Sequence, residues 1–153
     1  MNFINMKKFI IALLLFPIFS FAQVIPEKAN LITVTNSETA YANFTDVRLL
    51  LTKKGIEITK LDKDAFDIKT GLIEVKGAGS CYYEFFCRDN QIIISGKNKN
   101  DSIQGENKAT TSFEAITNTG TKDSPTKLSF EAMKEMAKLF GTKIKYEVSK
   151  YYQ

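Results

Sequence analysis

CYYEFFCRDNQIIIS, residues 81–95, decides the fold of this chain, because it predicts two apolar strands joined by a short turn. The segments 81–87 and 91–95 are rich in aromatic and β-branched side chains, which favour strands, and Arg88-Asp89-Asn90 is typical of a turn. Both segments are apolar on both faces, whereas a sheet with one face in water alternates apolar and polar residues. We therefore place them at the centre of a sheet.

Working outward from this stretch, alternation of apolar and polar residues predicts further strands. They cover residues 31–35, 56–59, 66–70, 72–75, 109–117 and 144–148. The turn Asp62-Lys63-Asp64 joins two of them into a hairpin, and Gly71 is a bulge or the end of a strand. The polar stretches 97–108 and 118–124 predict loops.

Two segments have the three- and four-residue spacing of amphipathic helices. The first carries Ala40, Phe44, Val47 and Leu51, and the second carries Phe130, Met133, Met136, Ala137 and Phe140. Thr35-x-x-Glu38 has the spacing of a capping box before the first helix, and Gly55 suits its left-handed stop. Pro125 behind a Ser124 cap suits the start of the second helix, and Gly141 its end.

The order strand, helix, several antiparallel strands, helix, strand predicts the fold class. It is an α+β two-layer sandwich, in which two helices pack on one face of an antiparallel sheet. We expect residues 23–153 to form this single α+β domain, which suits the usual size of one domain, roughly 100–200 residues.

Residues 1–22 predict a secretory signal peptide. Met6-Lys7-Lys8 places positive charge before the apolar run 9–19, and Ser20-Phe21-Ala22 offers small residues for cleavage before Gln23. The apolar run is shorter than the roughly 20 residues that span a bilayer, so we expect no transmembrane anchor after processing. Because the leader carries two lysines and no acidic residue, its removal lowers the formal net charge from +4 to +2. The predicted location is therefore the periplasm or the exterior, and neither charge nor location favours nucleic-acid binding.

The composition excludes the commonest kinds of catalytic and metal-binding site, because the chain has no histidine. Ser-His-Asp and Cys-His sites need that side chain, and the usual zinc sites lose a ligand without it. Asp62, Asp64 and Asp67 lack the central glycine and late glutamate of a calcium loop, and turn chemistry explains the first two. We therefore predict no catalytic residue, no cofactor and no metal.

Cys81 and Cys87 are the two cysteines of the chain. An even pair in an exported protein suggests a disulfide. Six residues of continuous strand, however, separate the two Cα atoms by about 20 Å, and a disulfide needs them within about 7 Å. Two buried free thiols on one sheet face are favoured, and an internal bridge remains open if the segment is not one strand.

The run Leu31–Thr70, with Gly55-Ile-Glu-Ile, Asp62-Lys63-Asp64 and Ile68-Lys69-Thr70-Gly71, resembles small exported domains common in Bacteroidota. Those domains are similar to the TATA-binding-protein-like βαββ fold and to repeats in lipoproteins of the outer-membrane assembly machinery. The resemblance implies a fold and an envelope location. It implies no activity and no DNA binding, because a fold alone does not set function.

Two groups of residues are candidate sites. Tyr82, Phe86 and Ile93 share one sheet face; they are interface residues if that face is uncovered, and core residues if it is covered. Ser102, in Asp101-Ser102-Ile103, resembles the Asp-Ser/Thr-aliphatic acceptor of O-glycosylation in exported Bacteroidota proteins, and it falls in a predicted exposed loop.

These observations favour an exported, non-enzymatic binding domain whose ligand the sequence does not name. Its partner is then an envelope protein or ligand, or a second copy of the chain. The alternative is a structural component of the envelope or cell surface, glycosylated at Ser102.

Overall fold

A computed structural model describes residues 24–104 and 108–151 of the chain, and for residues 101–104 and 108–110 it describes the backbone alone. The elements are β1 (Leu31–Thr35), α2 (Ala40–Lys53), β2 (Ile58–Asp62), β3 (Asp67–Thr70), β4 (Ile73–Val75), β5 (Gly79–Arg88), β6 (Gln91–Gln104), β7 (Lys108–Ala115), α3 (Pro125–Lys138) and β8 (Lys143–Glu147). The predicted leader, residues 1–22, lies outside the described residues. Among the described residues, no helix is long and apolar enough to cross a membrane.

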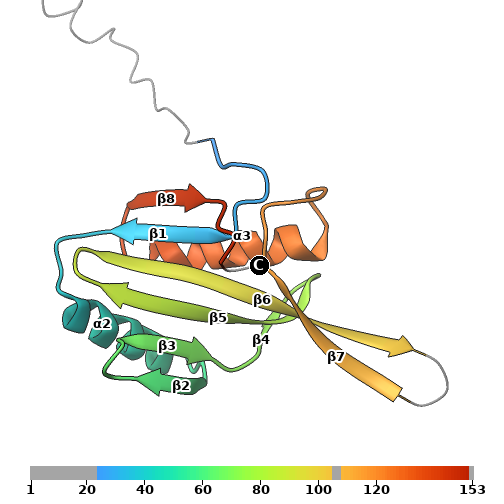
Figure 1. The fold of residues 1–153 in the computed structure, drawn as a ribbon, viewed down its shortest axis with the longest axis horizontal. Coiled ribbons are helices and arrows are strands. Elements are labelled where there is room, and N and C mark those ends of the chain that lie inside the picture. The colour runs from blue at the N-terminus through green and yellow to red at the C-terminus, as the bar shows by residue number, and fades with distance from the viewer. Residues whose placement is uncertain (1–23, 105–107, 152–153) are drawn as a thin grey trace, which may run out of the picture.

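All eight strands join one antiparallel sheet, as Figure 1 shows. Its order is β2-β3-β5-β6-β1-β8, and β4 pairs with β5 while β7 pairs with β6. The predicted hairpin over residues 81–95 is confirmed as the centre of this sheet, with Phe86 opposite Ile93 and Phe85 opposite Ile94. Its turn is short because Asn90 adopts a positive φ of 63°, which asparagine tolerates better than most residues.

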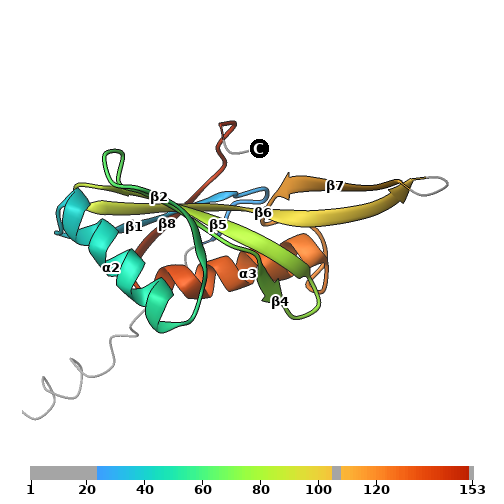
Figure 2. The same ribbon diagram turned by 90° about the horizontal axis from the view of Figure 1, so that it is seen from below.

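The two helices lie on one face of the sheet, so the predicted α+β two-layer sandwich is confirmed (Figure 2). Between the layers, the sheet contributes fully buried Ile32, Phe85 and Ile94, and the helices contribute Leu51 and Phe130. Burying side chains of this size stabilises the fold by about 1.5–3 kcal/mol each. The hydrophobic core therefore fixes which face of each strand points toward the helices.

The first helix begins four residues later than the capping-box spacing predicts. Thr39, not Thr35, is the N-cap, and its side chain accepts a hydrogen bond from the backbone N–H of Ala42 at 3.2 Å. The side chain of Asp89 accepts from the N–H of Ala40 at 2.8 Å. The turn of the central hairpin thus supplies a second cap, which the local spacing does not reveal, and Thr35 stays in β1.

The predicted ends of the helices are largely confirmed. Gly55 has a φ of +69°, the left-handed conformation expected after α2. Pro125 opens α3 behind Ser124, although the Ser124 hydroxyl donates to the carbonyl of Thr119 at 3.2 Å and does not cap the helix.

The predicted loop is wrong for residues 97–104 and for residue 108, the described part of that stretch. β6 continues to Gln104 and pairs with β7 from Lys97 opposite Ala115 to Gln104 opposite Lys108. The two strands leave the body of the sheet as a twisted ribbon (Figure 1). A polar composition predicts a loop only where the backbone N–H and C=O groups have no hydrogen-bond partners in another strand. Here β6 and β7 supply those partners to each other. The predicted strand over residues 109–117 is confirmed up to Ala115, where β7 ends.

Candidate binding face of the sheet

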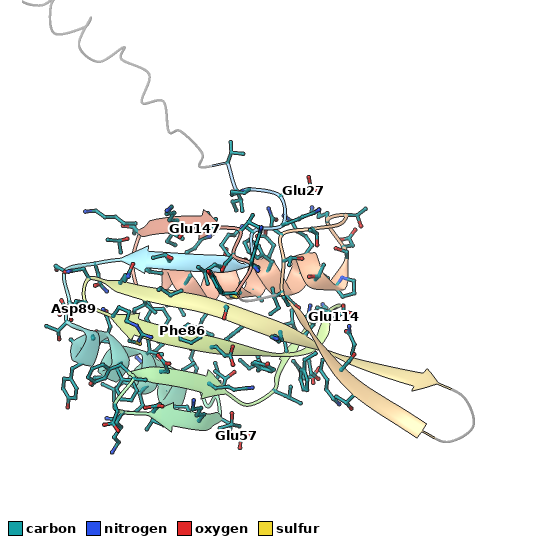
Figure 3. All side chains as sticks on the ribbon, in the orientation of Figure 1. Glu27, Glu57, Phe86, Asp89, Glu114 and Glu147 are labelled. Carbon is teal, nitrogen blue, oxygen red and sulfur yellow. The ribbon has the colours of Figure 1, made fainter. Side chains whose placement is uncertain are left out.

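The sheet face away from α2 and α3 carries the predicted interface residues. We call it the open face. Along its central strands it comprises Tyr82, Glu84, Phe86 and Arg88 of β5 and Gln91, Ile93, Ser95 and Lys97 of β6. Phe86 and Ile93 pair directly and are each half-buried, and Figure 3 labels Phe86 on β5 near the middle of the sheet. The strand register therefore brings Tyr82, Phe86 and Ile93 to one face, as the sequence predicts.

Tyr82 differs from the other two because neighbouring side chains cover it. Only 8% of its surface is exposed. The Phe113 ring of β7 lies 5.3 Å from its ring centroid, and the Lys69 ammonium lies 3.8 Å from that centroid. Such cation–π contacts contribute about 0.5–2 kcal/mol. Tyr82 is therefore a structural residue at the root of the ribbon, and Phe113, which is 44% exposed, is the more accessible aromatic residue there.

Paired charges border the apolar centre of the open face. On one side, Arg88 contacts Asp67 at 3.0 Å and Lys69 contacts Glu84 at 3.8 Å. On the other side, Lys145 contacts Glu147 at 2.8 Å within β8. Exposed pairs of this kind contribute only about 0–1 kcal/mol to stability. Their main consequence is a rim that presents both signs of charge around Phe86 and Ile93.

A small hollow of about 290 Å³ lies on the open face where the ribbon leaves the sheet. It is lined by Tyr82, Glu84, Ser95, Gly96, Lys97 and Tyr151. Tyr151 comes from the C-terminal segment, which lies on the side of the sheet opposite the helices (Figure 2). The Asn30 side chain holds this segment, because its amide donates to the Ser149 carbonyl and accepts from the Ser149 N–H, each at 2.7 Å.

A second hollow, of about 490 Å³, lies between α2 and the end of α3. Its lining includes the polar Asn36 and Asn43 and the apolar Leu49 and Leu139. Asn43 donates to the Arg88 carbonyl at 2.9 Å and accepts from Asn36 at 2.6 Å. These side-chain amides connect α2 to the central hairpin. The polar groups of this second hollow are therefore already engaged in hydrogen bonds that stabilise the fold.

Cys81 and Cys87 are free and buried, which confirms the favoured prediction for the two thiols. Both lie on the helix-covered face with Tyr83 and Phe85, opposite in direction to Tyr82 and Phe86. Burial raises the pKa of the Cys81 thiol and raises the pKa of Cys87 to about 12. Because the thiolate is the reactive form, neither side chain is a nucleophile at neutral pH.

Ser102 lies in β6, where its backbone pairs with Thr110, and its side chain lies outside the described residues. The predicted glycosylation site therefore sits on a strand of the ribbon and not in the expected loop. Asp62 accepts hydrogen bonds from the N–H groups of Asp64 and Ala65, at 3.2 and 3.0 Å, which confirms the turn chemistry expected there.

Sequence reasoning missed Ser95, Lys97, Phe113 and Tyr151 as residues of the open face. The alternation within residues 109–117 is the signal for Phe113, but only the β6–β7 register places it over Tyr82. No sequence pattern indicates that Tyr151 and Ser95 line the same hollow, because 56 positions separate them.

Comparisons with known proteins identify no relative of this chain. No protein-family model, no curated protein and no solved structure matches this chain.

Proposed function

We propose that this protein is an exported, non-enzymatic binding domain that contacts an envelope protein or ligand through the open face of its sheet. The observation that carries the proposal is the half-buried pair of Phe86 and Ile93 at the centre of that face. Apolar side chains gathered on a surface mark interaction sites more often than isolated ones do.

The charged rim supports the same proposal. Asp67 with Arg88 and Lys69 with Glu84 border the apolar pair on the β3 side. An apolar centre inside a polar, charged rim is the common anatomy of a protein interface. Both signs of charge are present, so the rim suits a partner with complementary charges of either sign rather than a uniformly acidic or basic polymer.

The predicted signal peptide supports export, and the absence of histidine from the chain supports a role without acid–base catalysis near neutral pH. Export is tested by purifying the exported protein and measuring its intact mass. The intact mass should correspond to a chain beginning at Gln23, and a retained leader would contradict the location we propose.

The binding role is tested by comparing three forms of the exported protein in capture experiments from envelope extract. The double variant Phe86→Ser and Ile93→Ser should lose the captured partner. Leu49→Ser, on the exposed side of α2 at 57% exposure, is the matched control and should retain it. Circular dichroism must show the same fold in all three. Capture that survives in the double variant contradicts the proposal.

The alternative, a structural surface component glycosylated at Ser102, is favoured by one observation. Ser102 lies on the ribbon that leaves the body of the sheet (Figure 1), where a glycan meets little of the domain. Its test is again the intact mass. A protein with the mass of the bare chain excludes this alternative.

A further inference from the structure

Ser95 is the one polar residue of the open face that is both buried and unsatisfied in the described part of the chain. Its surface is 3% exposed, and its hydroxyl oxygen has no hydrogen-bond partner there. A buried hydroxyl left unpaired destabilises the folded state, and such groups are rare in folded proteins. Because Ser95 lines the 290 Å³ hollow, a molecule bound there can supply the missing partner once the hydroxyl, which is itself closed to solvent, rotates toward it.

The groups around Ser95 both donate and accept hydrogen bonds. Glu84 lies directly opposite Ser95 on β5, and Lys97 follows two residues along β6 on the same face. The carboxylate of Glu84 accepts, the ammonium of Lys97 donates, and the Ser95 hydroxyl does both. The lining itself carries one negative and one positive side chain, and the Lys69 that pairs with Glu84 lies at its edge. A neutral molecule rich in hydroxyl groups therefore finds both donors and acceptors there.

Tyr151 supplies an accessible aromatic ring beside these groups. It is 96% exposed and lines the hollow, whereas the Tyr82 ring is occupied by Phe113 and Lys69. The hydrogen bonds of Asn30 to Ser149 position the segment that carries it. An aromatic ring presents an apolar surface on which the C–H face of a sugar can pack.

From this arrangement we infer that the hollow binds one ring of a neutral saccharide. The Glu84 carboxylate and the Lys97 ammonium bind neighbouring hydroxyl groups, Ser95 binds a third, and Tyr151 packs on the ring. The volume lies at the lower limit of ligand sites, roughly 300 Å³, and so suits a single ring. This inference deepens the proposed function, because the hollow belongs to the open face, and it rests on that proposal.

The test is an NMR titration of isotope-labelled protein purified after export. Glucose, galactose, mannose and N-acetylglucosamine are the probes, each added separately at high concentration, and glycylglycine is the zwitterionic comparison. At least one sugar should shift the backbone amide signals of residues 82–84 and 95–97. If no sugar shifts them, or if only glycylglycine does, the saccharide assignment is overturned.

Variants make the test specific to the proposed contacts. Ser95→Ala removes an unpaired hydroxyl, so it should keep or raise stability while weakening sugar binding by about tenfold. Glu84→Gln and Tyr151→Ala should each weaken binding similarly. Tyr41→Ala is the matched control, because Tyr41 is an exposed tyrosine on α2, at 68% exposure, and should leave binding unchanged. Equal binding by wild type and Ser95→Ala contradicts the inference.

The test of saccharide binding can be distinguished from the test of the proposed partner site. The double variant of Phe86 and Ile93 should lose partner capture and still show the sugar-induced shifts. Partner capture without sugar binding overturns only the ligand assignment. Sugar binding with capture that survives the double variant overturns the proposed role of Phe86 and Ile93.

Discussion

Gly96 sits where the hollow and the hydrophobic core meet, and replacing it with alanine is the sharpest test of the packing described above. A Cβ atom at this position would lie 2.6 Å from the Tyr82 carbonyl oxygen, 2.8 Å from Ile116 Cδ1 and 2.9 Å from Tyr83 Cδ1. The first neighbour is backbone, so β5 must move away from β6 to relieve the contact. Side-chain rotation alone cannot do so.

Overpacking of this kind costs about 1–3 kcal/mol, and the backbone contact places Gly96→Ala in the upper half of that range. Alanine also restricts the unfolded chain, which offsets about 0.4–1 kcal/mol. We therefore expect the free energy of unfolding to fall by about 1–2.6 kcal/mol. Urea denaturation followed by circular dichroism measures it, and the dependence on urea concentration should not change.

Gly55→Ala is the matched control. No atom lies within 4 Å of the Cβ position there, and the only cost is the left-handed conformation at φ +69°. That conformation costs about 1–2 kcal/mol, with the same offset from the unfolded chain. Gly96→Ala should therefore be the more destabilising of the two. Equal or smaller destabilisation at Gly96 would refute the close packing of β5 on β6 at the hollow.

Three further outcomes are expected. Thr70→Val should cost about 1–3 kcal/mol in urea denaturation, because the buried Thr70 hydroxyl accepts from the Tyr83 N–H at 3.0 Å; a neutral effect would contradict that bond. Asn30→Ala should release the C-terminal segment, so hydrogen exchange at the Ser149 amide should accelerate, and unchanged protection would exclude the contact. The raised pKa of Cys87, about 12 against 9.0, favours the neutral thiol in the folded state. The contribution of the neutral Cys87 thiol to the free energy of unfolding is complete below pH 9 and is lost between pH 9 and about 12. Cys87→Ala should flatten that decline in pH-dependent denaturation, and an equally steep decline would refute the assignment.

Local patterns in the sequence predicted most of the elements and the fold class. The apolar spacing of Phe44, Val47 and Leu51 predicted α2, and the stretch 81–95 predicted the central hairpin, because periodicity reports directly which side chains meet the core. Local reasoning misplaced the start of α2, since Asp89 reaches it from a distant turn. It also missed the ribbon, because strand pairing satisfies backbone groups whatever the polarity of the side chains.

The amino-acid sequence by itself determined the apolar strands, the two amphipathic helices and the shared face of Tyr82, Phe86 and Ile93. Alternation within a strand is a local property of the backbone, so neighbouring residues suffice to read it. Only the tertiary structure decided that Phe113 covers Tyr82, that Asn30 holds the C-terminal segment at Ser149, and that Tyr151 and Ser95 line one hollow. Those contacts join residues far apart in the chain, and their geometry depends on strand order and register across the whole sheet.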